Sequence, residues 1–414
     1  MPVTFVHAAD LHLDAPFQGI DASDDRVRSA LVAATYEALD RIVGICLDEQ
    51  VDFLVISGDV YNSRDKSLRS QFRFQSAMQR LAEVGIHVFV AQGNHDPAEG
   101  WSAGLPMPET VHYFSTARVE AVPFERAGEV VCTLYGRGYS KAAEKRDFAK
   151  DYRRAPGDRV AIGVLHTNVG GREGYEDYAP ASMDDLRAAR MDYWALGHIH
   201  KPDVLSEDPR VVYAGCPQGL NPKEDGPRGC YLVTIDGSTV TQRFCPTHSV
   251  MWVRDTCDVS SCDGISQVRE CIRAACERAR DRADGRPTVV RLDLVGRTDA
   301  HGALSRGTIF TDLACEVRDE QLRGEPWVWI DRLLDRTDAA HDIDTYREAQ
   351  EFGGDLVRLA DEIAADPQRV EALLASVLEP LESSVGELDL GMTAADLLAR
   401  ARDVGLDRLE GGGR

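Results

Sequence analysis

The sequence lacks any apolar run near the roughly 20 residues that a helix needs to cross a bilayer. Its first residues, MPVTFVHAADLHLDAPF, also lack the basic region and the long apolar region of a secretory signal peptide. We therefore expect a cytoplasmic protein without a membrane segment. A chain of 414 residues is long enough for two or three domains with a substantial core.

The sequence contains ten cysteines but lacks any CxxC pair. Cys257 and Cys262 are five residues apart, as are Cys271 and Cys276, and this spacing matches no common zinc-binding pattern. We interpret the cysteines as free thiols in a reducing compartment.

Basic residues are too few to balance the acidic ones, and the formal net charge is −22. This charge argues against a protein that holds nucleic acid by general electrostatic attraction alone. It does not exclude a nuclease whose metal ions and partner supply positive charge. Residues 137–154 differ from the rest, with seven basic and three acidic side chains. This stretch could contact a DNA backbone or form a solvated surface helix.

Short apolar runs alternate with helix-like stretches through the first 200 residues. The pattern predicts strands at 3–8, 53–56, 87–91, 160–165 and 193–196, and helices at 26–50 and 68–84. Such alternation indicates an α/β protein. The sequence pattern changes in residues 204–244, where it predicts further strands, including a hairpin that closes the core.

A second pattern begins after Pro246 and predicts a small α/β domain. It consists of a strand at 250–254, a helix at 264–283 and a strand at 288–295. From about residue 342 the sequence is helical, most clearly at 371–381 and 393–405. We therefore predict three domains, at 1–245, 246–340 and 341–414. Trp327 and Trp329 could form a binding stripe or pack in a core.

Polar side chains follow the predicted strands of the first region at their carboxyl ends, where α/β sheets bind ligands. Mixed nitrogen and oxygen donors suit Mn²⁺, Fe²⁺ or Zn²⁺ better than Ca²⁺ or Mg²⁺. Eight such groups are too many for one ion. They fit a pair of ions about 3.5–4 Å apart with a bridging carboxylate, as in two-metal phosphoryl hydrolases. The eight residues are Asp10, His12, Asp59, Asn94, His95, His166, His198 and His200.

Each motif alone is a weak signal, because a lone histidine at a strand end is more often a core residue than a ligand. Their joint order is specific. The sequence DLH, GDVYN, GNHD, LHTN and GHIH resembles that of the calcineurin-like metallophosphoesterase superfamily. Within it, HAADLHLDAPF, ALGHIHKP and GCPQG followed by GCYLVTID resemble the bacterial DNA-repair exonucleases of the SbcD/YhaO type. Beyond residue 245 the resemblance rests on architecture.

The resemblance implies a fold and an arrangement of domains. The fold is α/β, with a calcineurin-like core of two packed mixed sheets flanked by helices. Residues 1–245 would form the nuclease domain, 246–340 a small α/β cap, and 341–414 a helical tail that binds a partner. That partner would be an SMC-like coiled-coil ATPase of the SbcC/YhaN type. A self-contained helical subdomain is the alternative for the tail, and a homodimer stays open.

The resemblance also implies a role for each site residue. Asp10, His12, Asp59 and His200 would hold the first ion, and Asp59, Asn94, His166 and His198 the second. His95 would be the general acid that protonates the leaving oxygen, while water activated between two ions attacks phosphorus. The ions are expected to be Mn²⁺, with Fe²⁺ or Zn²⁺ as alternatives. Asp96 would either orient His95 or stabilise the local turn.

The implied function is that of a metal-dependent phosphodiesterase, most specifically a DNA exonuclease or endonuclease in DNA repair. One residue departs from the family pattern. Three positions after the bridging Asp59, relatives of SbcD have a histidine that bears on exonuclease action, and this chain has Asn62. A carboxamide side chain neither gains nor loses a proton in this pH range, so it cannot act as an acid or a base there. The alternatives are a phosphodiesterase or phosphatase for nucleotides or other small phosphoesters, and a non-catalytic scaffold.

Overall fold

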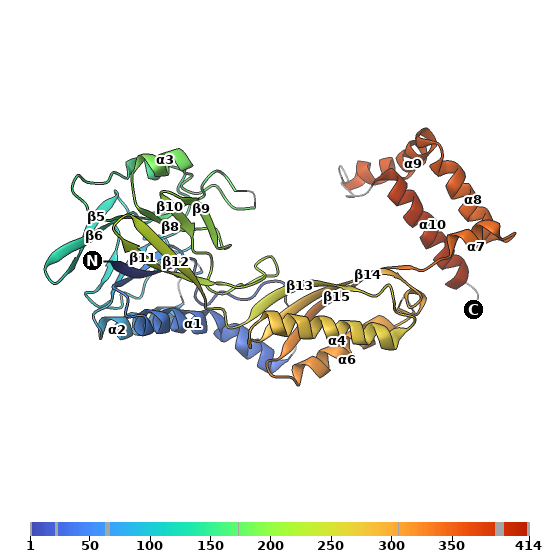
Figure 1. Cartoon of the computed structure of the whole chain (residues 1–414), viewed down its shortest axis with the longest axis horizontal. Coiled ribbons are helices and arrows are strands. Elements are labelled where there is room, and N and C mark those ends of the chain that lie inside the picture. Colours follow the sequence, from blue (N-terminus) through green and yellow to red (C-terminus); the bar gives the residue numbers. More distant parts are fainter. Residues whose placement is uncertain are drawn as a thin grey trace. The chain divides into compact units, whose positions relative to one another are not determined.

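The structure is a computed structural model that describes residues 2–20, 24–62, 67–172, 174–304, 306–385 and 393–411. The chain divides into two compact units (Figure 1). The first unit comprises residues 1–254 together with 279–290 and 325–331, and the second contains the remaining segments. The domain boundaries at 245 and 340 remain a prediction. No helix in the described ranges is both long and apolar enough to span a membrane.

The first sheet of unit one has a parallel centre and an antiparallel edge. Strands β1, β2, β3 and β4 run parallel, and the hairpin β11–β12 pairs with β1 in the antiparallel direction. The predicted hairpin is therefore confirmed. The strands are β1 (Val3–Ala8), β2 (Phe53–Ser57), β3 (His87–Ala91), β4 (Val111–Tyr113), β11 (Gly229–Asp236) and β12 (Thr239–Pro246).

The second sheet is also mixed, and its strand order is β5-β6-β7-β8-β10-β9. Strands β6, β7, β8 and β10 are parallel neighbours, while β5 and β9 are antiparallel edges. Its strands are β5 (Glu120–Arg126), β6 (Glu129–Gly136), β7 (Ala161–His166), β8 (Tyr193–Gly197), β9 (Asp203–Glu207) and β10 (Arg210–Tyr213). The β5–β6 hairpin is absent from the strands predicted above.

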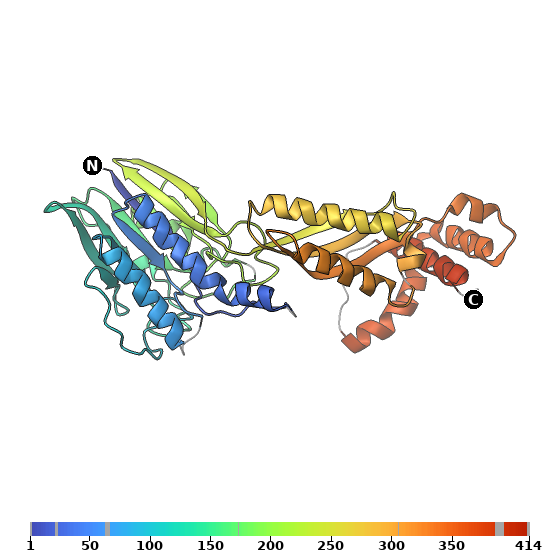
Figure 2. The same ribbon diagram turned by 90° about the horizontal axis from the view of Figure 1, so that it is seen from below.

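The two sheets pack face to face around an apolar core. Phe5 and Phe53 of the first sheet lie in one buried cluster with Ile162, Tyr193 and Val212 of the second. The outer face of the first sheet is covered by α1 (Asp25–Asp48) and α2 (Leu68–Ala82), which lie side by side (Figure 2). Helix α3 (Met183–Ala188) lies on the outer side of the second sheet. The predicted core of two mixed sheets flanked by helices is thus confirmed.

A third, three-stranded sheet and a set of helices make up the rest of the chain. The sheet order is β13-β14-β15, and α4 and α6 lie along one of its faces. Both predicted strands and the predicted helix of this region are present. The elements are β13 (Met251–Asp258), α4 (Ile265–Arg282), β14 (Thr288–Thr298), α5 (His301–Leu304), α6 (Ile309–Leu322), β15 (Val328–Ala339), α7 (Ile343–Glu348), α8 (Phe352–Ala364), α9 (Pro367–Val385) and α10 (Ala394–Gly411).

Two open interpretations of the sequence are settled by burial. Trp327 and Trp329 are 3% and 2% exposed, so both pack in a core and form no binding stripe. All ten cysteines are free thiols, as predicted, and nine of them are buried or partly buried. Cys315 is the exposed one.

The surface helix considered for residues 137–154 is not formed. Apart from a short 3₁₀ turn at Ala149–Asp151, the segment has no helix. Its aromatic side chains Tyr139, Phe148 and Tyr152 are fully buried and fix the segment to the second sheet as an irregular connection. Several of its basic side chains pair locally, as with Arg137 and Arg146 on Asp151.

The two sheets approach each other closely where β2 and β8 end. A Cβ atom added to Gly197 would lie 1.9 Å from the carbonyl oxygen of Ser57, so only glycine fits there. Across the same contact, the Ser57 hydroxyl donates to the carbonyl of Ala195 over 2.9 Å. The chain therefore draws the carboxyl ends of both sheets into one place.

The Gly197→Ala variant tests this close approach. We expect its free energy of unfolding to fall by about 1–3 kcal/mol or more, because the methyl group forces the sheets apart. Chemical denaturation monitored by circular dichroism measures the change. Gly44→Ala is the matched control, since a Cβ there meets nothing within 4 Å and alanine favours the interior of α1. Equal stability of the Gly197→Ala and wild-type chains would contradict the predicted clash.

Candidate metal centre

The structure brings all eight predicted site residues to the edge where both sheets end. Asp10 and His12 follow β1, Asp59 follows β2, and Asn94 and His95 follow β3. From the second sheet, His166 is the last residue of β7, and His198 and His200 follow β8. Residues far apart in the sequence therefore share one site, as expected for the carboxyl ends of parallel strands.

Four of these residues have left-handed backbone conformations that side chains rarely adopt. The φ angles are 51° at Asp10, 42° at His12, 52° at Asp59 and 97° at His198. Each such residue costs about 1–3 kcal/mol unless its surroundings hold it in place. Backbone hydrogen bonds do so here, from Asp10 to Gly58 and from His12 to Asp59, both over 3.0 Å. The chain bends sharply after each strand, and the side chains point into the site.

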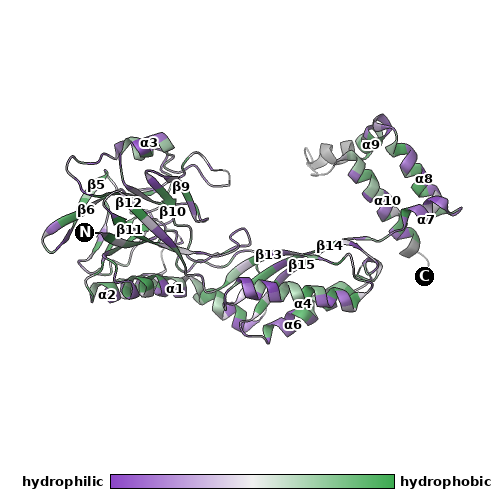
Figure 3. Cartoon of the chain, in the orientation of Figure 1, coloured by the Kyte–Doolittle hydropathy of each residue, from purple (hydrophilic) through white to green (hydrophobic). Residues whose placement is uncertain are grey.

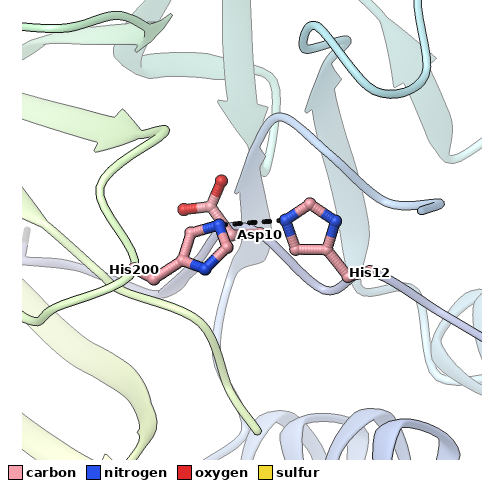
Figure 4. A group of neighbouring side chains, drawn as sticks. All are labelled: Asp10, His12 and His200. Carbon is pink, nitrogen blue, oxygen red and sulfur yellow. Dashed lines mark hydrogen bonds between the residues drawn. The ribbon is translucent and has the colours of Figure 1, made fainter. Parts of the chain in front are cut away.

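Asp10, His12 and His200 form the first group of the site (Figure 4). The Nε2 atoms of His12 and His200 face each other at 3.1 Å. The Asp10 carboxylate accepts hydrogen bonds from the backbone N–H of His198, which hold it toward the same point. Asp10 and His12 are almost fully buried. The three side chains could bind one metal ion between them.

Glu224 is a buried acid that the sequence reasoning missed. Its Oε1 atom lies 2.7 Å from Nδ1 of His200, and its Oε2 atom accepts the backbone N–H of Leu220. Burial alone would raise the pKa of Glu224, but the hydrogen bond and charge of His200 lower it to about 2. This carboxylate holds the His200 proton on Nδ1, so Nε2 presents a lone pair to the site. The loop position of Glu224 gives no local signal in the sequence.

Asp59 lies between the two groups of the site. Its Oδ2 atom is 3.8 Å from Nε2 of His12 and 3.4 Å from Nε2 of His166. Its Oδ1 atom accepts the backbone N–H of His95 over 2.9 Å. A carboxylate that reaches both groups has the position needed for a bridging ligand.

His166, His198 and Asn94 form the second group. Nδ1 of His166 donates to the carbonyl of Ser57 over 3.0 Å, and Nε2 of His198 donates to the carbonyl of Glu176 over 2.8 Å. Their other ring nitrogens lie 2.9 Å and 3.2 Å from the Asn94 side-chain oxygen. Both rings thus turn unprotonated nitrogens toward the centre of the site.

The site suits metal ions because atoms with lone pairs, which can only accept hydrogen bonds, face one another there. Nε2 of His166 carries a lone pair and points at carboxylate and amide oxygens, an arrangement that is repulsive until a cation lies between them. Burial lowers the pKa of His12 to about 3 and that of His198 to about 4, so both rings are neutral at pH 7, as metal binding requires.

His95 is exposed, unlike the neighbouring Asp59 and His12. Its Nδ1 atom donates to the backbone carbonyl of Asn62 over 2.9 Å, and its ring meets that of His12 edge to face. Nε2 is therefore the ring nitrogen of His95 that can contact a bound ligand. Asp96 accepts the backbone N–H groups of Val60 and Gly93, both over 2.9 Å, which supports the structural alternative for this residue.

Comparison with known families matches two parts of the chain. The family described as calcineurin-like phosphoesterase matches residues 3–202, which contain all eight site residues. The family described as the middle domain of metallophosphoesterase YhaO matches residues 252–338, which contain the third sheet apart from its first and last residues.

The chain is also similar to individual curated proteins. It is 35% identical over 339 residues to the uncharacterized metallophosphoesterase YhaO of Bacillus subtilis, covering 81% of this chain and 82% of that protein. It is 26% identical over 247 residues to the DNA double-strand break repair protein Mre11 of Sulfurisphaera tokodaii, covering 57% of this chain and 60% of that protein. Among solved structures, purple acid phosphatase PPD1 of yellow lupin aligns with a TM-score of 0.36 at 11% identity, covering 60% of this chain and 52% of that chain.

Glu224→Gln tests how His200 is held. We expect Mn²⁺ affinity at the first group to fall about 10–100-fold, because an amide orients the imidazole less strongly than a carboxylate does. Isothermal titration calorimetry of the metal-free chain measures both binding events. Asp225→Asn is the matched control, since its side chain is exposed and should leave both affinities unchanged. Equal weakening of both events, or of neither, would show that Glu224 does not act through His200.

Proposed function

Because the chain belongs to the calcineurin-like metallophosphoesterase family, a family of phosphoester hydrolases, we propose that it is a metal-dependent phosphodiesterase that cleaves DNA. The cleavage would be that of an exonuclease or endonuclease in DNA repair. The observation that carries the proposal is the edge where eight side chains from both sheets converge, with the lone pair of His166 facing oxygen lone pairs of Asp59 and Asn94. Relatives named as DNA double-strand break repair proteins support DNA as the substrate.

The family uses a dinuclear metal centre, and we propose the residues that would hold it here. Asp10, His12, Asp59 and His200 would bind the first ion, and Asp59, Asn94, His166 and His198 the second. Imidazole and carboxylate donors favour Mn²⁺, with Fe²⁺ or Zn²⁺ as alternatives. When bound, such a pair supplies hydroxide near neutral pH and neutralises charge on the phosphoryl oxygens.

The protein's own groups orient the substrate and move the proton. His95 is exposed beside the site, and its contact with the carbonyl of Asn62 directs Nε2 outward. From this position the imidazolium would donate its proton to the leaving oxygen as the phosphodiester breaks. The side-chain N–H of Asn62 would donate a hydrogen bond to a phosphate oxygen, but Asn62 would transfer no proton.

We also propose a partner, an SMC-like coiled-coil ATPase of the SbcC/YhaN type. A net charge of −22 leaves little general attraction for DNA, so a partner that holds the duplex would supply what this chain lacks. The helices α8 and α9 carry exposed apolar side chains, including Phe352, Leu359 and Val377, among hydrophilic ones (Figure 3). Their exposure suits helices that dock on another protein.

A second function is favoured by Asn62, which stands where SbcD relatives have a histidine. A phosphodiesterase or phosphatase for nucleotides or other small phosphoesters would use the same centre without that histidine. The metal-free scaffold is disfavoured, because none of the eight side chains is missing from the site.

The variants His95→Ala and Asp59→Ala separate proton donation from metal binding. We expect His95→Ala to keep both metal ions while kcat for DNA falls about 10²–10⁴-fold, the usual contribution of a general acid. Hydrolysis of bis-p-nitrophenyl phosphate should fall less, because p-nitrophenolate leaves without a proton. Asp59→Ala should lose metal and activity together. Metal analysis after gel filtration and steady-state kinetics provide the measurements, and full DNA cleavage by His95→Ala would refute the assigned role.

A comparison of substrates tests the proposed function itself. The full chain is incubated with Mn²⁺ and end-labelled duplex DNA, single-stranded DNA or bis-p-nitrophenyl phosphate. We expect all activity to require the metal and at least one DNA substrate to be degraded. Cleavage of the small diester without DNA degradation, both with and without an SMC-like ATPase, would favour the second function.

A further inference from the structure

A cavity of about 630 Å³ lies beside the first group of the site. Arg172, Tyr175, Lys201, Lys223, Tyr231 and Phe244 contribute to its walls, and we call it the basic pocket. Glu224 and Ile199, the neighbours of Lys223 and His200 in the chain, also line it. Two further charged residues of the lining, Asp225 and Arg228, have opposite signs, so the cations of the lining still outnumber its carboxylates. The basic pocket is therefore continuous with the residues that hold His200.

Two lysines give the basic pocket free positive charge. Lys201 directly follows His200, and Lys223 directly precedes Glu224. Both residues are exposed, and neither ammonium group pairs with a carboxylate in the described part of the chain. Arg172, by contrast, forms an ion pair with Asp203, in which its Nη2 atom lies 2.5 Å from the Oδ2 atom of the carboxylate. Two unpaired cations beside the site of a chain with a net charge of −22 are positioned to attract an anion.

Aromatic rings form other walls of the basic pocket. The ring centroid of Tyr175 lies 5.9 Å from that of His198 and 6.1 Å from that of His200. Tyr231 and Phe244, on the paired strands β11 and β12, contact each other with ring centroids 5.3 Å apart. Cations combined with aromatic faces are typical of sites that bind single-stranded nucleic acid, in which bases stack on rings and phosphates meet lysines.

We propose that the basic pocket holds the nucleotide next to the cleaved phosphate, with its base unpaired, so that the substrate is a single-stranded DNA end. Lys201 and Lys223 bind the flanking phosphate, and Tyr175 stacks on the base. A base within a duplex cannot enter a pocket without leaving its partner, so the pocket selects unpaired ends. This inference rests on the proposed function, since it names the form of DNA that the same site accepts.

The kinetic test uses Lys201→Ala and Lys223→Ala in the full chain with Mn²⁺. For each variant we expect kcat/KM for single-stranded DNA, divided by kcat/KM for bis-p-nitrophenyl phosphate, to fall about tenfold, as for one charged hydrogen bond lost. The dependence of log KM on log salt concentration should weaken by about 0.7 per lysine. Tyr175→Ala should lower the same ratio, and Tyr175→Phe should restore it by keeping the ring. Arg190→Ala, an equal loss of an exposed charge just before β8 and at the opposite end of that strand from the site, should leave the ratio unchanged.

A binding test separates this inference from the proposed function. Fluorescence anisotropy with a short fluorescein-labelled oligodeoxythymidylate is measured in EDTA, where no cleavage occurs. Weaker binding by the two lysine variants supports the basic pocket even if the wild-type chain cleaves no DNA, which would refute only the proposed function. The inference is overturned if Arg190→Ala weakens binding as much as they do. It is also overturned if wild-type chain binds no oligonucleotide, or cleaves blunt duplex as fast as single strands.

Discussion

The close approach of β2 and β8 is the constraint on which the rest of the site depends. Two separate sheets contribute the proposed ligands, and their ends meet only because Gly197 has no side chain against the carbonyl of Ser57. His166 reinforces the contact by donating to that same carbonyl. The same backbone oxygen thus excludes a side chain at residue 197 and accepts a hydrogen bond from His166. The packing of the two sheets and the geometry of the site are therefore coupled.

The two groups of the site differ in what holds their histidines. His166 and His198 donate to backbone carbonyls, so the fold itself orients them. His200 is instead held by the side chain of Glu224, on a loop that Arg228 fastens through the carbonyls of Glu224 and Asp225. The second group is therefore a product of the sheets, whereas the first depends on a loop that also carries Lys223 of the basic pocket.

Much of the site was predictable because its signals are local. Each proposed ligand lies at, or up to four residues beyond, the carboxyl end of an apolar strand, and the five predicted strands agree with the structure to within a residue or so at each end. Glu224 escaped prediction because its role depends on a contact with a residue 24 positions away. The segment at 137–154 was misread for a related reason, since its charges suggested a surface helix while Tyr139, Phe148 and Tyr152 anchor it in the core. The edge strand β5 was missed because a strand with one exposed face shows little continuous hydrophobicity.

The left-handed backbone at Asp10 and Asp59 has a consequence for how this protein could evolve. Asparagine tolerates this conformation about as well as aspartate does, whereas branched residues do not. A single change from aspartate to asparagine would remove a charge from the site and leave the turn intact. Descendants that lose the proposed metal centre yet keep the fold are therefore within one substitution of this sequence, and in such descendants the site would still be recognisable by its shape.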